Sequence, residues 1–127
     1  MLFKKYDPLK NKMFQILNPQ GKIVNEDLVP NIPDEKLIHM YRSMVIGRVA
    51  DIKAVQFQRQ GRMLTYAPNQ GQEAAQIGAM AALEKTDWLS PAFREFNAMI
   101  YHGVTLEQAF LYWYGNERGS HFNEGVN

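Results

Sequence analysis

Several features common in other protein classes are missing from this chain of 127 residues. It has no cysteine, which excludes disulfides, zinc–thiolate sites and a thiol nucleophile, and fits a reducing compartment. No apolar run approaches the roughly 20 residues that a membrane helix needs. The 14 basic and 13 acidic residues leave a net charge of +1, without the basic excess of a nucleic-acid surface. We therefore expect a cytoplasmic protein that binds neither nucleic acid nor membrane.

The sequence also lacks the common motifs of catalysis. Neither G-x-G-x-x-G nor G-x-x-x-x-G-K-[ST] occurs, so the usual phosphate loops are absent. The sequence shows neither a Ser-His-Asp set nor a pair of carboxylates that would indicate a hydrolase. The histidines show no metal-ligand spacing; we interpret His39 and His102 as structural or surface residues, and the role of His121 stays open.

What is present suits a packed, mostly helical chain with 46% hydrophobic residues. Asn18–Gly21 has the residues of a type I turn, which predicts a short β-hairpin over 13–24. Thr105–Gln108 has the pattern of a capping box. Gly61, Gly103 and Gly115 are expected helix stops. Apolar spacing and these signals predict helices over 34–57, 72–83, 91 or 92 to 101, and 105–115.

The second of these helices is unusually poor in large side chains. Its small residues recur at steps of three and four and form one nearly flat face: Gly71, Ala75, Gly78, Ala79 and Ala82. Such a face favours close packing of a neighbouring helix. Phosphate binding at the helix N-terminus is the alternative, and the glycines alone support it weakly.

The best candidate anion site follows Pro91. Because Pro91 is expected to begin a helix, Arg94 would lie in the first turn, where a cation opposes the positive end of the helix dipole. An anion bound there would relieve that conflict, although a salt bridge or a plain surface position is the commoner explanation. Tyr66 lies between a glycine turn and a proline turn and could present its hydroxyl to a cleft.

Considered together, these landmarks resemble the α subunits of thiamine-diphosphate-dependent 2-oxo acid dehydrogenases, most of all the bacterial pyruvate dehydrogenase branch. They occur in the family's order and spacing over residues 13–127. The matching stretches are 41–45 with Arg48 and Asp51, then 58–62, 71–74, 87–88, 91–94, 102–103 and Gly115.

The resemblance implies an α/β thiamine-diphosphate-binding fold in the full subunit. Residues 1–33 would form an N-terminal arm with the hairpin and a connector. Residues 34–127 would form the mostly α-helical N-terminal portion of a truncated dehydrogenase domain. The family assembles α and β subunits into a heterotetramer that decarboxylates pyruvate oxidatively and passes the acetyl group to a lipoyl-bearing acyltransferase core, which gives acetyl-CoA in the whole complex.

Carried over residue by residue, the resemblance assigns Phe93 and Arg94 to the cofactor diphosphate and Tyr66 to the substrate channel. The family usually has Tyr where Phe93 stands, so one hydrogen bond to the cofactor would be missing. The family's magnesium motif, Gly-Asp-Gly with a later Asn, is absent from the 127 residues. Magnesium ligands are therefore expected downstream, and the isolated chain is expected to be an inactive fragment.

Two alternatives stay open at this point. The first is a related α subunit that acts on branched-chain 2-oxo acids or acetoin. The second is a non-catalytic helical interaction module, which the aromatic residues of the second half would also suit.

Overall fold

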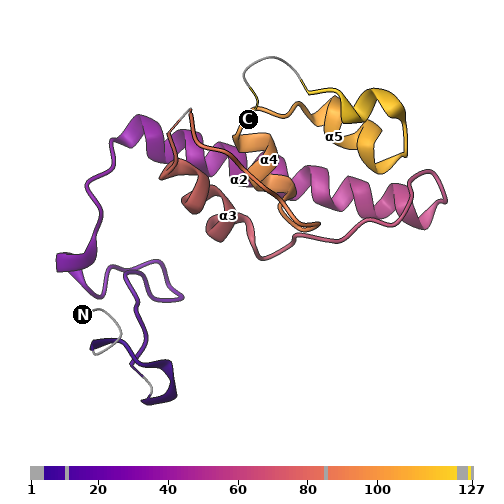
Figure 1. The fold of residues 1–127 in the computed structure, drawn as a ribbon. Helices are drawn as coiled ribbons and strands as arrows, with labels where there is room; N and C mark the ends of the chain where they lie inside the picture. Colours follow the sequence, from indigo (N-terminus) through magenta and orange to yellow (C-terminus); the bar gives the residue numbers. More distant parts are fainter. Residues whose placement is uncertain (1–4, 11, 85, 123–125, 127) are drawn as a thin grey trace. The chain divides into compact units, whose positions relative to one another are not determined.

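The structure is a computed structural model that describes residues 5–10, 12–84, 86–122 and 126. The chain divides into two compact units, Met1–Pro33 and Asp34–Asn127. The described residues form α-helices and short 3-10 helices (η) but no β-strand (Figure 1). None of these helices is long and apolar enough to cross a membrane. The elements are η1 Pro8–Lys10, η2 Glu26–Leu28, α2 Asp34–Arg59, α3 Glu73–Ala81, α4 Phe96–Tyr101, α5 Leu106–Trp113 and η3 Glu117–Ser120.

In the first unit, the prediction of a β-hairpin is wrong, although the predicted turn forms. Asn18 organises the turn, because its Oδ1 accepts hydrogen bonds from the backbone N–H groups of Gln20 and Lys22 at 3.0 and 2.9 Å. Beyond the turn there is a single antiparallel bridge, between Leu17 and Ile23. Both of these side chains are about half exposed. A two-stranded ribbon without an apolar surface to pack on is marginal, which explains why the pairing stops there.

The long helix α2 confirms the prediction for residues 34–57 and ends at the expected glycine. Gly61 has a φ of 69°, in the left-handed region that glycine adopts without strain. Its N–H donates to the carbonyl of Gln58, and the N–H of Arg62 donates to that of Phe57. This pair of bonds is a Schellman motif. The Arg62 guanidinium then lies 4.6 Å from the centroid of the Phe57 ring.

The three shorter helices form one packed group with α2 (Figure 1): α2 contacts α3 and α4, α3 contacts α4, and α4 contacts α5. The predicted capping box of α5 is present, since the Thr105 hydroxyl accepts from the N–H of Gln108 and the Gln108 side chain accepts from the N–H of Thr105. The stretch after α5 begins with η3. Residues 123–125 and 127 lie outside the described residues.

The core of the second unit is aromatic on one side and made of small residues on the other. Tyr66 contacts Phe96 and Trp113 edge to face, with ring centroids 6.0 and 5.3 Å apart. Such pairs contribute about 0.5–1.5 kcal/mol each beyond their buried area. The buried residues of this cluster are Ala50, Ala54, Met63, Tyr66, Phe96, Val104 and Ala109. The core therefore joins α2, the loop after it, α4 and α5.

Close helix packing occurs at a different glycine from those expected. A Cβ on Gly47 of α2 would lie 1.8 Å from Oδ1 of Asn97 on α4, so only glycine fits there. The small face of α3, by contrast, is exposed, and a Cβ on Gly78 would meet no atom within 4 Å. The prediction that a neighbouring helix covers this face is wrong within the described residues, because α3 packs through Glu73 and Ile77 instead.

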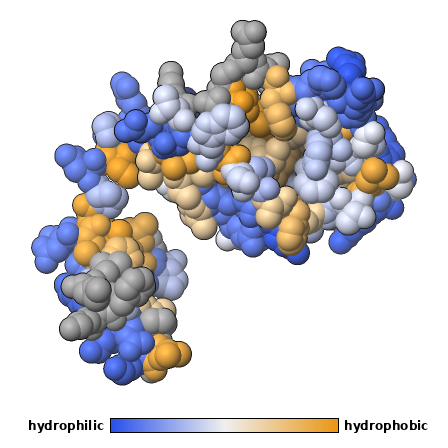
Figure 2. Space-filling view, viewed as in Figure 1, coloured by the Kyte–Doolittle hydropathy of each residue, from blue (hydrophilic) through white to orange (hydrophobic). Residues whose placement is uncertain are grey.

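The face of α2 that carries its large apolar side chains is exposed. These residues are Leu37, Ile38, Tyr41, Val45, Ile46, Val49 and Ile52, here called the apolar face of α2. The buried residues of the same helix are Gly47, Ala50, Asp51 and Ala54. Figure 2 accordingly shows hydrophobic residues among hydrophilic ones on the visible surface of this unit. An exposed apolar surface of this extent is unusual for a surface that functions in contact with water.

Candidate functional site

The candidate anion-binding residues lie in the loop just before α4. Phe93 is 59% exposed, and the Cζ atom of Arg94 lies 5.3 Å from the centroid of its ring. One Arg94 nitrogen, Nη1, donates to the carbonyl oxygen of Pro68 at 2.9 Å. No further bond from this exposed guanidinium is formed within the described residues. The other N–H groups of Arg94 are thus available to an anion.

The expectation that Arg94 lies in the first turn of a helix is wrong. Helix α4 begins at Phe96, later than the predicted start at residue 91 or 92. The Glu95 carboxylate explains the delay, because its Oε2 accepts from the backbone N–H groups of Ala92 and Arg94 at 2.9 and 3.1 Å. These bonds fold the preceding residues into a turn. The candidate site is consequently a loop, and the helix dipole gives no argument for it.

The backbone around Arg94 is held by a side chain of α3. Gln76 donates from Nε2 to the carbonyl oxygen of Arg94 at 2.8 Å. The Oε1 atom of the same side chain accepts from the N–H groups of Asn97 and Ala98 at 3.0 and 3.2 Å. Because the first N–H groups of a helix have no partner within it, Gln76 caps α4 from a neighbouring helix. The two backbone donors also fix which end of the Gln76 amide is oxygen.

A buried polar network anchors the loop that receives Arg94. Asp51 of α2 is 1% exposed, and its Oδ1 accepts from the Tyr66 hydroxyl and from the N–H of Asn69, both at 2.7 Å. The Asn69 side chain, which is fully buried, donates to the carbonyl of Ala67 and accepts from Nε2 of Gln76 at 3.0 Å. The network therefore joins α2, the loop and α3 directly beside Pro68.

Tyr66, the candidate residue for the substrate channel, lies inside this network. It is 3% exposed, and its hydroxyl is bonded to Asp51 rather than presented at the surface of the described chain. Burial raises the pKa of Tyr66 well above its usual value, and the hydrogen bond to Asp51 raises it further. The structure places the Arg94 guanidinium beside the Phe93 ring, whereas Tyr66 is buried in the core.

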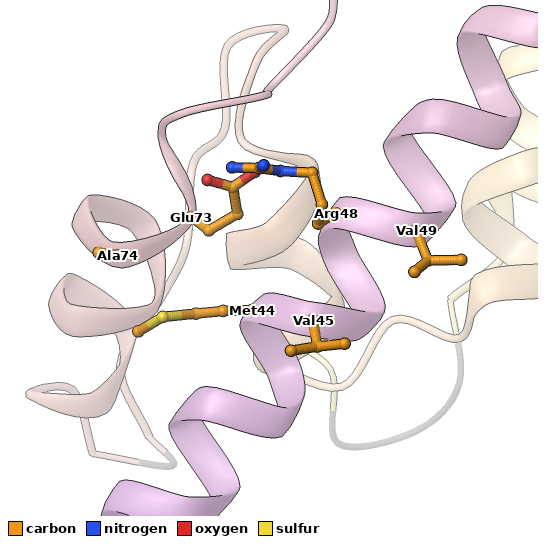
Figure 3. A pocket seen from close by; sticks show the side chains of 6 residues that line it. All are labelled: Met44, Val45, Arg48, Val49, Glu73 and Ala74. Atoms are coloured by element: carbon orange, nitrogen blue, oxygen red, sulfur yellow. The ribbon is translucent and has the colours of Figure 1, made fainter.

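A second cluster of charge lies between α2 and α3. Nε of Arg48 donates to Oε1 of Glu73 at 2.5 Å, and Glu73 also accepts from the N–H of Gly71. Figure 3 shows the two side chains meeting across the space between the helices. They line a pocket of about 310 Å³ together with Met44, Val45, Val49 and Ala74. The pair holds the start of α3 against α2.

The two ionisations of this pair support each other. The hydrogen bond from Arg48 lowers the pKa of the Glu73 carboxyl, against a smaller opposing effect of burial. The same bond raises the pKa of Arg48. The Glu73 side chain is 9% exposed and that of Arg48 is 41% exposed, so the carboxylate is shielded while part of the guanidinium meets solvent. Both groups are charged at neutral pH.

Two other pockets are apolar. One, of about 450 Å³, lies between α2 and α5 and is lined by Val45, Ile46, Val49, Ala50, Lys53, Phe57, Leu106 and Phe110. A smaller one of about 110 Å³ is lined by Leu89, Pro91, Met99, His102, Val104, Phe122 and Val126. Neither pocket presents the convergent polar groups typical of a small-molecule site.

Two of the histidines contact neighbouring residues of the fold. The His39 ring lies 5.2 Å from that of Tyr101, and Nδ1 of His121 is 3.0 Å from the carbonyl oxygen of Glu117. Throughout the described ranges, no three His, Cys, Asp or Glu side chains are grouped so that they could hold a metal ion.

Comparison with known proteins shows the family to which this chain belongs. The sequence model of the family described as "Dehydrogenase E1 component" matches residues 41–125, and the chain belongs to that family. The matched residues include α2 from residue 41 onward, all of α3, α4 and α5, and the loop that carries Arg94.

Relatives of this chain include bacterial proteins named pyruvate dehydrogenase E1 component subunit alpha. The one from Acholeplasma laidlawii is 64% identical over 106 residues, which cover 84% of this chain and 31% of that protein. Those from Staphylococcus aureus and Staphylococcus epidermidis are 45% and 44% identical over 118 residues, which cover 93% of this chain and 32% of each relative. The chain thus spans about a third of the length of the curated relatives it matches.

Sequence reasoning missed the residues that hold the candidate site in place. Asn69 and Gln76 were assigned no role, and Arg48, Asp51 and Glu73 only marked a resemblance. One signal was present in the sequence, since Asp51 lies between Ala50 and Ala54 on a helix face of small residues. A charge at such a position indicates a buried, hydrogen-bonded carboxylate. Nothing in the local sequence points to Gln76.

Proposed function

We propose that this chain is the N-terminal part of an α subunit of the pyruvate dehydrogenase complex. In that role it serves the thiamine-diphosphate-dependent oxidative decarboxylation of pyruvate and acetyl transfer to a lipoyl carrier, which gives acetyl-CoA in the whole complex. The geometric observation that carries the proposal is the exposed Arg94 guanidinium, which donates to the carbonyl oxygen of Pro68 while Gln76 holds the backbone carbonyl of Arg94. The family membership and the 64% identity to a relative of that name support it.

The residues present fit the diphosphate end of the cofactor. Arg94 offers a permanent positive charge and several N–H donors in a planar fork, which suits phosphate oxygens. Phe93 packs beside the guanidinium and leaves it directed to solvent. When bound, thiamine diphosphate supplies the carbanion that attacks the 2-oxo group. The part of Arg94 and Phe93 is to bind and orient the diphosphate.

Magnesium does not fit the residues of the described chain. It takes oxygen ligands in near-octahedral geometry, and no group of three carboxylates or histidines is assembled here. We therefore assign the magnesium ligands to residues downstream and no step of the reaction to the metal in this chain. Tyr66 is kept as a proposed wall of the substrate channel, with its hydroxyl held by Asp51.

The wider assembly belongs to the same proposal. It comprises an α/β thiamine-diphosphate-binding fold in the full subunit, a β subunit in a heterotetramer, a lipoyl-bearing acyltransferase core and a cytoplasmic location. Residues 1–33 would be the arm and residues 34–127 the helical portion of the dehydrogenase domain. The exposed apolar face of α2 supports this view, because a surface of that kind is normally covered in the functional assembly.

The test is turnover by the whole α subunit assembled with its β subunit. Release of carbon dioxide is compared for pyruvate and for branched-chain 2-oxo acids, and cleavage of acetoin is measured beside them. We expect pyruvate to give the highest kcat/KM. A preference for branched-chain acids or acetoin would move the chain to that branch, and no turnover of any of them would refute the enzymatic proposal. The 127-residue chain alone is expected to be inactive.

A further inference from the structure

We propose that Gln76 is a positioning residue for the cofactor diphosphate, acting through Arg94. This inference rests on the proposed function, in which Arg94 binds that diphosphate. Gln76 does not reach the exposed guanidinium itself. Its side chain fixes the backbone that carries Arg94 and the start of the next helix, so it determines where the positive charge is held.

The bonds of Gln76 divide between its two polar ends. The oxygen end caps α4 through the N–H groups of Asn97 and Ala98. The nitrogen end donates to the carbonyl of Arg94 at 2.8 Å and to Oδ1 of Asn69 at 3.0 Å. A residue needed only as a helix cap would use the oxygen alone. The nitrogen end is the part that restrains the Arg94 loop.

The far side of this restraint is rigid. Asn69 is fully buried and is tied through its N–H to Asp51 of the long helix α2. The Arg94 side chain returns to the same loop by its bond to the carbonyl of Pro68. A closed ring of contacts results, which runs from Arg94 to Gln76, to Asn69, along the chain to Pro68 and back to Arg94. Loss of the Gln76 amide N–H group breaks this ring, because both the bond to Arg94 and the bond to Asn69 are lost.

A pair of substitutions separates capping from positioning. Gln76→Glu keeps an oxygen that accepts from the N–H groups of α4, and a negative charge at a helix start is favourable. It replaces the donor that meets Arg94 and Asn69 by an acceptor, which repels both of their oxygens. Gln76→Met keeps the length of the side chain and removes both functions. Gln56→Ala is the matched control, because Gln56 is an exposed glutamine of α2 with no side-chain bond in the described chain.

The experiment measures the Kd for thiamine diphosphate of the whole α subunit assembled with its β subunit, by titration calorimetry at a fixed magnesium concentration, with Tm recorded for each variant. We expect Gln76→Glu and Gln76→Met to raise Kd by about 2- to 12-fold, the range of one lost hydrogen bond between neutral groups. Gln76→Glu keeps the cap of α4 but should lower Tm through the repulsion of the Arg94 and Asn69 oxygens, and Gln56→Ala should keep both Kd and Tm.

A double-substitution cycle with Arg94→Ala separates this inference from the function on which it rests. If Gln76 acts through Arg94, Gln76→Glu should change Kd by less than about twofold when Arg94 is already alanine. An equal fold-change in both backgrounds would overturn the inference while leaving the role of Arg94 intact, as would a normal Kd for Gln76→Glu. A normal Kd for Arg94→Ala would instead overturn the proposed function.

Discussion

The two faces of α2 are built in the opposite way from an ordinary surface helix. The face toward α3 and α4 buries Gly47, Ala50, Asp51 and Ala54, which are small or charged. The other face exposes large apolar side chains such as Tyr41 and Val49, which are 68% and 54% exposed. A surface helix of a globular protein normally shows the reverse arrangement.

The contrast teaches which interactions specify this part of the fold. On the buried face, close backbone approach at Gly47 and hydrogen bonds to Asp51 fix how the neighbours sit. On the exposed face, the large side chains have the chemistry of a core but little to pack against within the described residues. Substitutions on the two faces should therefore differ sharply in their effect on stability.

The largest effect is expected at Gly47. In Gly47→Ala the new Cβ would lie 1.8 Å from Oδ1 of Asn97, a side chain that is 1% exposed and would have to shift within the core. We expect a loss of about 2–3 kcal/mol in the free energy of unfolding, as for other overpacked cores. Urea or thermal unfolding of the whole α subunit assembled with its β subunit measures it.

Gly78→Ala is the matched control for this substitution. It also replaces a helical glycine, but its Cβ would meet no atom within 4 Å. Alanine should stabilise the helix there by about 0.5–1 kcal/mol. Destabilisation of both variants to the same extent would contradict the packing described for α2 and α4.

A smaller but clear difference is expected between neighbours on opposite faces of α2. Asp51→Ala leaves the Tyr66 hydroxyl and the N–H of Asn69 without their acceptor in a buried place, at a cost of about 1–3 kcal/mol. Ile52→Ala removes a side chain that is 42% exposed and should cost less than about 1 kcal/mol. Denaturant midpoints of the two variants test the difference, and a greater loss for Ile52→Ala would reverse the comparison.

The next effect is a pH dependence. Because the folded-state pKa of Glu73 lies below its unfolded value of about 4.5, the carboxylate contributes stability above that pH. This contribution is lost as the pH falls through the folded-state pKa. Glu73→Gln should therefore be less stable than the wild type at pH 7 and show a weaker loss of stability on acidification.

Thermal unfolding between roughly pH 3 and pH 7 measures this difference in acid sensitivity, because that interval includes the range over which carboxylates titrate. Glu84→Gln serves as the control, because Glu84 is an exposed residue with no ion pair in the described chain. An acid dependence in Glu73→Gln identical to that of the wild type would show that the bond to Arg48 does not contribute.

Local signals predicted much of the fold. The capping box at Thr105 and the helix stop at Gly61 each depend on a few adjacent residues, and both occur in the structure. The start of α4 was predicted too early. Pro91 was expected to begin the helix, but the Glu95 carboxylate accepts from the backbone N–H groups of Ala92 and Arg94 and folds these residues into a turn. The hairpin was overestimated because the turn alone does not supply a surface for its strands.

The candidate site was predicted only in part, for a similar reason. Phe93 was found by resemblance alone, whereas Arg94 was found both by resemblance and by an argument from a helix start that was wrong. The structure places the Arg94 guanidinium beside the Phe93 ring. Gln76 was not predictable, since each of its important partners is brought to it by the packing of α3 against α4. The small residues of α3 suggested close packing, yet glycine in a sequence does not reveal whether a neighbour approaches it.

The affinity of the assembled component for thiamine diphosphate tests the central claim most directly. Titration of the whole α subunit with its β subunit should give a Kd at least tenfold higher for Arg94→Ala than for the wild type, a difference of about 1.4 kcal/mol. Arg94→Lys should recover part of the loss, because the charge is kept without the planar fork. An unchanged Kd for Arg94→Ala would contradict the account.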